Sequence, residues 1–271
     1  MMSTSTQAST ISNRKPLSAT LCAFACAVAL SLGSTTVAAA SFDFITLNFT
    51  GGLSESQKSV FTQAELWWEG IISGYQPVVK TVSGVTIDAS ASQIDGVGLI
   101  LGSAGPYQTA NPAPNGGYVL PTRGEVTFDS ADIGTLETNS TLFDVITHEI
   151  AHVLGFGTLW THNGLYVTGS GKYTGASGLA AYQTEFDLAA TFVPVELDGG
   201  DGTANGHWNE GGELQYELMT GWYNEPAFLS NTTRQSFVDL GYTVNPVPLP
   251  GAVWLFLSGL IALGFTRRRR A

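Results

Sequence analysis

Residues 147–157 read Thr-His-Glu-Ile-Ala-His-Val-Leu-Gly-Phe-Gly, and this stretch decides how the rest of the chain is interpreted. His148 and His152 lie four residues apart, and Glu149 directly follows the first histidine. On an α-helix, side chains at positions i and i+4 share one face, so both imidazoles can reach a single metal ion. The pattern H-E-x-x-H is typical of zinc hydrolases. Two nitrogens, one further protein ligand and a water suit tetrahedral Zn²⁺ with an open position.

The residues around this motif predict a buried helix. Its apolar side chains occupy nearly every side of the helix: Leu142, Phe143, Val145, Ile146, Ile150, Ala151, Val153 and Leu154. Burying two histidines and a glutamate in such a helix is costly unless they have partners. A metal ion therefore explains the motif better than a surface helix that carries these residues by chance. We expect Ser140 or Thr141 to cap the helix, Asp144 to favour its first turn and Gly155 to end it.

The pattern of residues 1–40 predicts an export signal that is not part of the folded domain. Arg14 and Lys15 precede a mostly apolar run over residues 17–32, and residues 38–40 are three alanines of the kind that signal peptidase accepts. Cleavage is expected directly after these alanines. A membrane anchor is the alternative, but the apolar run is short and ends in small residues.

Residues 247–271 predict a sorting or anchoring tail. Val-Pro-Leu-Pro leads into an apolar run over residues 251–266, and residues 267–270 are four arginines that favour a cytoplasmic C-terminus. This three-part tail resembles the PEP-CTERM sorting signal of Gram-negative bacteria, although Leu249 stands at the middle of the Pro-Glu-Pro position. The resemblance implies an exosortase-type processing protease and transient anchoring in the inner membrane. The protein would then reach the cell surface, an extracellular matrix or the medium; a simple tail anchor is the alternative.

Residues 41–246 are expected to form one domain. They contain 22 acidic and five basic side chains, which gives a net charge of −17. Such a surface disfavours nucleic acid and anionic membranes as partners. Solubility outside the cell explains the charge; calcium binding by Asp198 and Asp201 in a glycine-rich loop is a second explanation. Both cysteines, Cys22 and Cys26, lie in the expected signal, so the domain has no disulfide.

Hydrophobic patterning predicts alternating helices and strands in the first half of the domain and a loop-rich second half after Gly157. A helix is expected to open at Ser54, and a short one is expected over residues 178–183. The expected strands cover residues 42–49, 78–87, 97–101 and 124–129. An edge strand near a zinc cleft can pair with an extended peptide substrate.

The third metal ligand does not follow from the helix alone. His162 and His207 are the other histidines of the chain. A compact metzincin would place its third histidine six residues after His152, where this chain has Thr158. His162 is only ten residues after His152, so it could reach the metal only through a turn, and both histidines stay open at this point.

The order of motifs from residue 147 to residue 242 resembles the leishmanolysin family of zinc metallopeptidases. The motifs are H-E-x-x-H-x-x-G-F, then H-W-x-E beginning at His207, then E-L-M-T-G around Met219. The resemblance implies an α+β, metzincin-like zincin fold. An N-terminal mixed sheet would carry the active-site helix, and the loop-rich C-terminal half would carry a Met-turn. The lack of cysteines in residues 41–246 departs from the disulfide-rich eukaryotic members and leaves activation without a cysteine switch.

Carried over residue by residue, the resemblance makes His148, His152 and His207 the ligands of one catalytic Zn²⁺, Glu149 the general base and Met219 the Met-turn residue. It implies an exported endopeptidase that hydrolyses peptide bonds by Glu149-assisted attack of a zinc-bound water. A non-catalytic surface or matrix adhesion protein with the same fold is the alternative, and hydrolysis of a non-peptide bond is a third.

Two further side chains have candidate roles at such a site. Tyr223 can donate a hydrogen bond to a transition-state oxyanion, as tyrosines after the Met-turn do in some metzincins. Glu210 can be an outer partner of a ligand histidine. Each also has a plain structural explanation.

Overall fold

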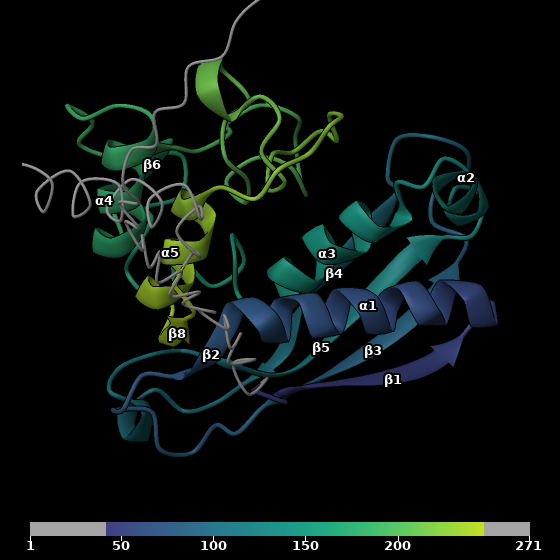
Figure 1. The fold of residues 1–271 in the computed structure, drawn as a ribbon, viewed down its shortest axis with the longest axis horizontal. Coiled ribbons are helices and arrows are strands. Elements are labelled where there is room, and N and C mark those ends of the chain that lie inside the picture. The colour runs from purple at the N-terminus through teal and green to yellow at the C-terminus, as the bar shows by residue number, and fades with distance from the viewer. Residues whose placement is uncertain (1–41, 247–271) are drawn as a thin grey trace, which may run out of the picture. The chain divides into compact units, whose positions relative to one another are not determined.

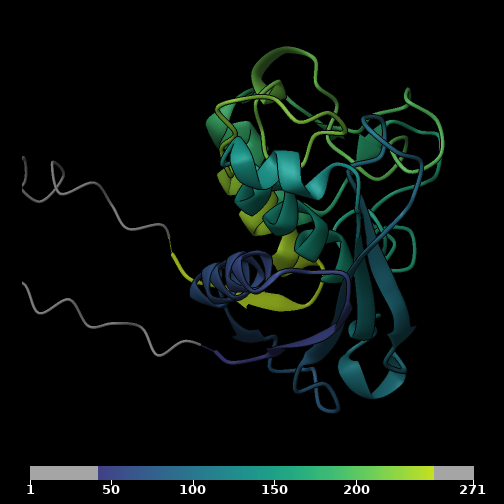
Figure 2. The same cartoon turned by 90° about the vertical axis from the view of Figure 1, so that its right-hand side faces the viewer.

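A computed structural model describes residues 42–246 (Figures 1 and 2). The expected signal, residues 1–40, and the expected tail, residues 247–271, lie outside the described residues. Within the described part of the chain, no helix is both long and apolar enough to cross a membrane.

The first half of the domain contains a four-stranded mixed sheet, as predicted. Its strands are β1 (Ile45–Gly51), β3 (Val85–Ser92), β4 (Gly102–Thr109) and β5 (Pro121–Asp129). The order is β1-β3-β5-β4; β1, β3 and β5 are parallel, and β4 runs antiparallel to β5. β4 is therefore an edge strand, and its outer side has no strand partner among the described residues.

Two helices, α1 (Glu55–Ile71) and α3 (Leu142–Val153), lie side by side against this sheet (Figures 1 and 2). Strand β3 shows why: its alternate side chains are buried and contribute to the core. The indole Nε1 of Trp68 on α1 donates to the carbonyl oxygen of Thr147 on α3 at 2.9 Å. The short helix α2 (Ile133–Thr138) precedes α3. The sheet and α1 thus hold the helix that carries the motif.

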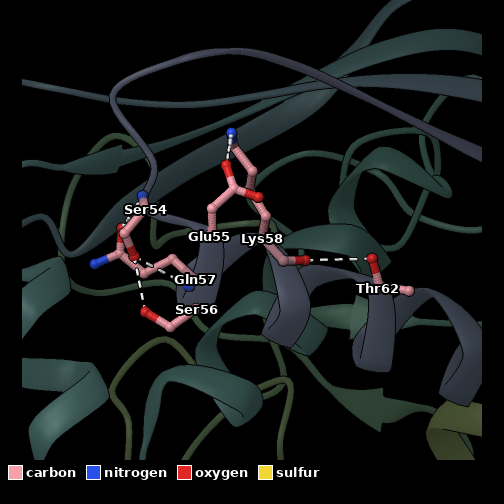
Figure 3. Close-up of polar contacts among 6 residues, drawn as sticks. All are labelled: Ser54, Glu55, Ser56, Gln57, Lys58 and Thr62. Carbon is pink, nitrogen blue, oxygen red and sulfur yellow. Dashed lines mark hydrogen bonds and ion pairs between the residues drawn. The ribbon is translucent and has the colours of Figure 1, made fainter.

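Helix α1 begins where the sequence predicts. Ser54 is its N-cap and forms a capping box with Gln57: the Ser54 Oγ accepts from the Gln57 backbone N at 3.2 Å, and the Gln57 Oε1 accepts from the Ser54 backbone N at 2.9 Å (Figure 3). Lys58 pairs with the exposed Glu55 one turn away. Two of the unpaired amides at the helix start are thereby satisfied.

The second half of the domain is loop-rich, as predicted, with short regular elements. These are β6 (Lys172–Tyr173), α4 (Ala176–Glu185), β7 (Val193–Pro194), α5 (Asn231–Asp239), β8 (Tyr242–Val244) and the 3-10 turn Gly212–Leu214. The expected helix at residues 178–183 lies within α4. Helix α5 was not predicted, although Ser230 caps it. β8 pairs with β2 (Ile72–Tyr75), and β6 pairs with β7.

The prediction of a strand over residues 97–101 is wrong. These residues belong to a loop in which Leu99 has φ 65°, and strand β4 begins only at Gly102. Two buried carboxylates hold this loop: Asp129 accepts from the backbone N of Ile94, Asp95 and Gly96, and Asp132 accepts from that of Gly98. The backbone N–H of Ala131, together with those of the loop, donates to Asp129 and lowers its pKa to about 2. The loop amides therefore bond to carboxylates and not to a neighbouring strand.

Two other local predictions need correction. The strand expected over residues 78–87 begins only at Val85, because the backbone amides of Lys80 and Thr81 donate to the side chain of Asn115. Thr141 is the N-cap of α3, but its hydroxyl donates to the Leu136 carbonyl oxygen and not to the helix start.

Replacing the cap of α1 tests this account of the fold. Ser54→Ala removes the acceptor for the Gln57 amide and is expected to lower the free energy of unfolding by about 1 kcal/mol. Ser59→Ala, an exposed position within the same helix, is the control and should cost nothing. Urea unfolding of both variants checks this, and an equal effect of the two substitutions would contradict it.

Candidate metal centre

Helix α3 places His148 and His152 on one face, one turn apart. Their Nε2 atoms are 2.9 Å apart, and the rings meet at an interplanar angle of 74°. His152 is 6% exposed, and His148 is partly buried. The spacing predicted from the sequence therefore brings both ring nitrogens to one point.

The structure brings His207 to the same point. Its Nε2 atom lies 3.1 Å from that of His148 and 2.9 Å from that of His152. Among the described residues, these three histidines are the group of His, Cys, Asp or Glu whose ligand atoms lie close enough to share an ion. Asp198 and Asp201 form no such group, so the calcium interpretation has no support.

Two backbones must approach closely for His207 to reach the helix. After α3, Gly155 and Gly157 both have positive φ, of 110° and 72°. A Cβ atom on Gly157 would lie only 2.2 Å from the carbonyl oxygen of Gly206, the residue before His207. Glycine at position 157 is therefore needed twice, for its left-handed conformation and for its lack of a side chain.

The outer nitrogen of every ring is held by a backbone carbonyl oxygen. His148 Nδ1 lies 2.7 Å from the oxygen of Leu218, His152 Nδ1 lies 2.9 Å from that of Phe156, and His207 Nδ1 lies 2.8 Å from that of Thr203. A carbonyl oxygen only accepts, so each Nδ1 carries the proton and donates it. Each Nε2 then presents a lone pair, and three lone pairs face one another.

Burial keeps these rings neutral. It lowers the pKa of His148 to about 3 and that of His207 to about 4, and it lowers the pKa of His152 well below its ordinary value. The hydrogen bond to the Leu218 carbonyl acts in the opposite direction on His148 but does not offset burial. Neutral imidazoles with converging lone pairs repel one another unless a cation lies between them.

This donor set fits zinc. A tetrahedral zinc with nitrogen ligands at about 2.0–2.1 Å has ligand nitrogens roughly 3.3 Å apart. The distances between the Nε2 atoms are a few tenths of an ångström shorter than this, a difference that small ring rotations remove. Histidines whose outer N–H groups donate to fixed carbonyl oxygens are the usual arrangement at zinc sites.

Glu149 lies beside the triad and against the edge strand. Its side chain is 7% exposed, and burial raises its pKa to about 8. A Cβ atom on Gly102, the first residue of β4, would lie 3.3 Å from the Glu149 Oε1 atom. Sequence patterning does not predict this contact, because it places the end of the strand at residue 101.

The segment around Met219 packs next to the histidines and bonds to their neighbourhood through its backbone. Met219 is fully buried, and its carbonyl oxygen accepts from the backbone N of Trp208 at 3.0 Å. The preceding carbonyl, of Leu218, is the acceptor for His148. The role of Met219 as a Met-turn residue stays a prediction, but Leu218 contacts His148, and Met219 contacts Trp208, the residue after His207.

The remaining candidates are described by the contacts that they make. His162 is exposed and outside the triad. The Thr158 hydroxyl donates to the His152 carbonyl oxygen at 2.7 Å. Tyr223 donates to Asp144 on α3, and burial is the largest cause of its raised pKa. Glu210 accepts from the backbone N of Trp222 and not from a ligand histidine.

Comparison with known proteins gives a partial likeness. A leishmanolysin homolog from Crithidia fasciculata is 34% identical over 112 residues, which cover 36% of this chain. The chain spans only 16% of that relative's own length. No protein-family model matches the chain. The sequence thus resembles a leishmanolysin homolog over part of its length, and the histidine triad is compatible with that likeness.

The close approach at Gly157 yields a matched test. Gly157→Ala is expected to displace the Gly206 backbone and weaken zinc binding by about tenfold or more. Gly164→Ala is the control, because Gly164 has a similar φ of 70° and a Cβ atom added there would meet nothing within 4 Å. Its backbone strain should cost stability without changing zinc affinity. Zinc titration in competition with a chromophoric chelator checks both; equal affinities would contradict the account.

The lowered pKa values predict a pH dependence of the metal-free protein. Below pH 6.5 the unfolded chain binds protons that the folded triad excludes, so stability falls as pH decreases. Each histidine contributes on the order of 1 kcal/mol per pH unit at most. His207→Gln should reduce the loss of stability between pH 7.5 and 5.5. Urea unfolding with a chelator present measures it, and identical slopes would refute the prediction.

Proposed function

We propose that this chain is a zinc-dependent endopeptidase of the leishmanolysin type. The observation that carries the proposal is the convergence of three neutral Nε2 atoms within 3.1 Å beside the buried acid Glu149. The partial likeness to a leishmanolysin homolog supports the same class. His148, His152 and His207 would hold the zinc, and Met219 would be the Met-turn residue.

Zinc, when bound, supplies a Lewis acid that makes a water more acidic and offsets negative charge on a substrate carbonyl oxygen. Glu149 has the position and the basicity for the proton transfers. Because burial raises its pKa, its carboxylate is a stronger base than an exposed glutamate. It would take the proton from the attacking water and give it to the leaving amine.

The edge strand favours an extended peptide as substrate. The outer side of β4 has no strand partner among residues 42–246, and the strand begins against Glu149. A peptide that pairs with this edge would bring its backbone carbonyls past Glu149 and the triad. Main-chain pairing of this kind favours an unfolded or loop segment of a protein.

We further propose that the protein is exported. The support is the pattern of residues 1–40, and the tail over residues 247–271 adds an exosortase-type processing step as a prediction. The final location, at the surface, in a matrix or in the medium, depends on that step.

Digestion of casein or gelatin tests the proposed activity. The zinc-loaded protein should cleave the substrate, and a chelator should stop cleavage. Glu149→Ala should retain zinc but lose activity by a factor on the order of 10² or more, because the proton acceptor is absent. A zinc-loaded protein that cleaves nothing would favour the adhesion alternative, and full activity of Glu149→Ala would refute the assigned base.

The contact between Gly102 and Glu149 gives a finer test. Gly102→Ala places a methyl group 3.3 Å from the carboxylate and should lower kcat on the order of tenfold, with zinc affinity unchanged. Gly105→Ala on the same strand meets only the Thr158 methyl at an ordinary 3.8 Å and is the control. Steady-state kinetics on a fluorogenic peptide measure both, and equal kcat values would contradict the proposed position of Glu149.

A further inference from the structure

Glu217 is a buried carboxylate that has no role in the proposed chemistry and that contacts the segment around Met219. Glu217 is 2% exposed. Its Oε2 atom accepts from the Met219 backbone N at 2.6 Å. Its Oε1 atom accepts from the Ser230 backbone N at 2.9 Å, the Ser230 Oγ at 2.8 Å and the Thr233 Oγ1 at 2.6 Å. Neither ion pair found among the described residues includes it. Four donors therefore satisfy an acid that burial would otherwise make costly.

The first of these bonds leads to His148. The Met219 N–H and the Leu218 C=O belong to one planar peptide unit and point in opposite directions. Glu217 holds the N–H end of that plane at 2.6 Å, and His148 Nδ1 donates to the C=O end at 2.7 Å. The Leu218 backbone N is itself fixed by the carbonyl oxygen of Phe228. The orientation of the His148 ring thus depends on a peptide that Glu217 holds.

A second path leads to His207. Thr233 Oγ1 donates to Glu217 and accepts from the Trp208 Nε1 at 2.7 Å. Trp208 directly follows His207, is fully buried, and donates its backbone N–H to the Met219 carbonyl oxygen. Glu217 orients the Thr233 hydroxyl so that its oxygen lone pair faces the indole. Both the side chain and the backbone of Trp208 are therefore tied to residues that Glu217 holds.

We propose that Glu217 is a positioning residue that keeps His148 and His207 in their metal-binding orientation, through the Leu218–Met219 peptide and through Thr233 and Trp208. The inference rests on the proposed zinc site and not on the hydrolysis of a peptide bond. An acid that only stabilised the start of α5 would have no effect on the orientation of the ligand histidines.

Glu217→Gln is the direct test, because it keeps the volume and replaces one acceptor with an NH₂ donor. At least one of the four donors then meets another donor. Glu185→Gln is the matched control. Glu185 accepts from the Asn231 and Thr232 backbone N atoms and from the Thr232 hydroxyl in the first turn of the same helix. Neither Met219 nor Trp208 is among the partners of Glu185.

Two measurements on the full chain are independent of peptidase activity. The first is zinc affinity by competition with a chromophoric chelator, expected to weaken roughly ten- to hundredfold in Glu217→Gln and to stay unchanged in Glu185→Gln. The second is the visible absorption of the cobalt-substituted protein, which reports ligand geometry and should change only in Glu217→Gln. Zinc affinity within twofold of the parent protein with an unchanged cobalt spectrum would overturn the proposal, as would equal losses in both variants.

A second pair of variants covers the case in which Glu217→Gln does not fold. Thr233→Val removes the hydroxyl that links Glu217 to Trp208. Thr232→Val, at the neighbouring position, removes the hydroxyl that donates to Glu185 and is the control. Both threonines are fully buried. Thr233→Val should weaken zinc binding and alter the cobalt spectrum, and Thr232→Val should do neither. Equal behaviour of the two would overturn the proposal. A protein that binds zinc normally but cleaves no peptide would refute the proposed function and leave this inference intact.

Discussion

The structure depends on three neutral imidazoles whose unprotonated nitrogens point at one another within 3.1 Å. This arrangement is unfavourable without a cation, because three lone pairs meet in a buried place. It is also fixed from outside, since each outer N–H donates to a backbone carbonyl oxygen. Backbone acceptors hold both the tautomer and the ring orientation more firmly than flexible side chains would. The backbone therefore holds the three rings in an orientation that could bind a metal ion.

Close backbone contacts and buried carboxylates fix the path of the chain. No disulfide can do so, because the expected mature domain has no cysteine. Gly157 lets the segment before His207 approach the end of α3. Asp129 and Asp132 fasten the loop that leads into β4, and Glu217 fastens the segment behind the triad. Asp129 and Glu217 each accept from several backbone amides, and Asp132 accepts from the amide of Gly98. In an acidic domain with five basic side chains, hydrogen bonds and not ion pairs satisfy these buried acids.

The sequence predicts those parts of the site that depend on local periodicity. The helical spacing of His148 and His152, the buried character of α3 and the cap at Ser54 all follow from patterns within a few residues. His207 lies 55 residues from His152, so only the order of motifs shared with a known family pointed to it. Gly102 and Glu217 were missed because their contacts come from distant strands and loops. The error at residues 97–101 has the same origin: apolar spacing there suggests a strand, but carboxylates from β5 and the turn after it capture the loop amides.

X-ray absorption at the zinc edge of the purified protein, compared with the same measurement on His207→Ala, counts the imidazoles that bind the metal. A zinc ion held by the triad predicts three imidazole nitrogens at about 2.0–2.1 Å and one oxygen in the parent protein. It also predicts one fewer imidazole, or no bound zinc, in the variant. A parent spectrum with two imidazoles or fewer, or a spectrum unaffected by His207→Ala, would contradict it.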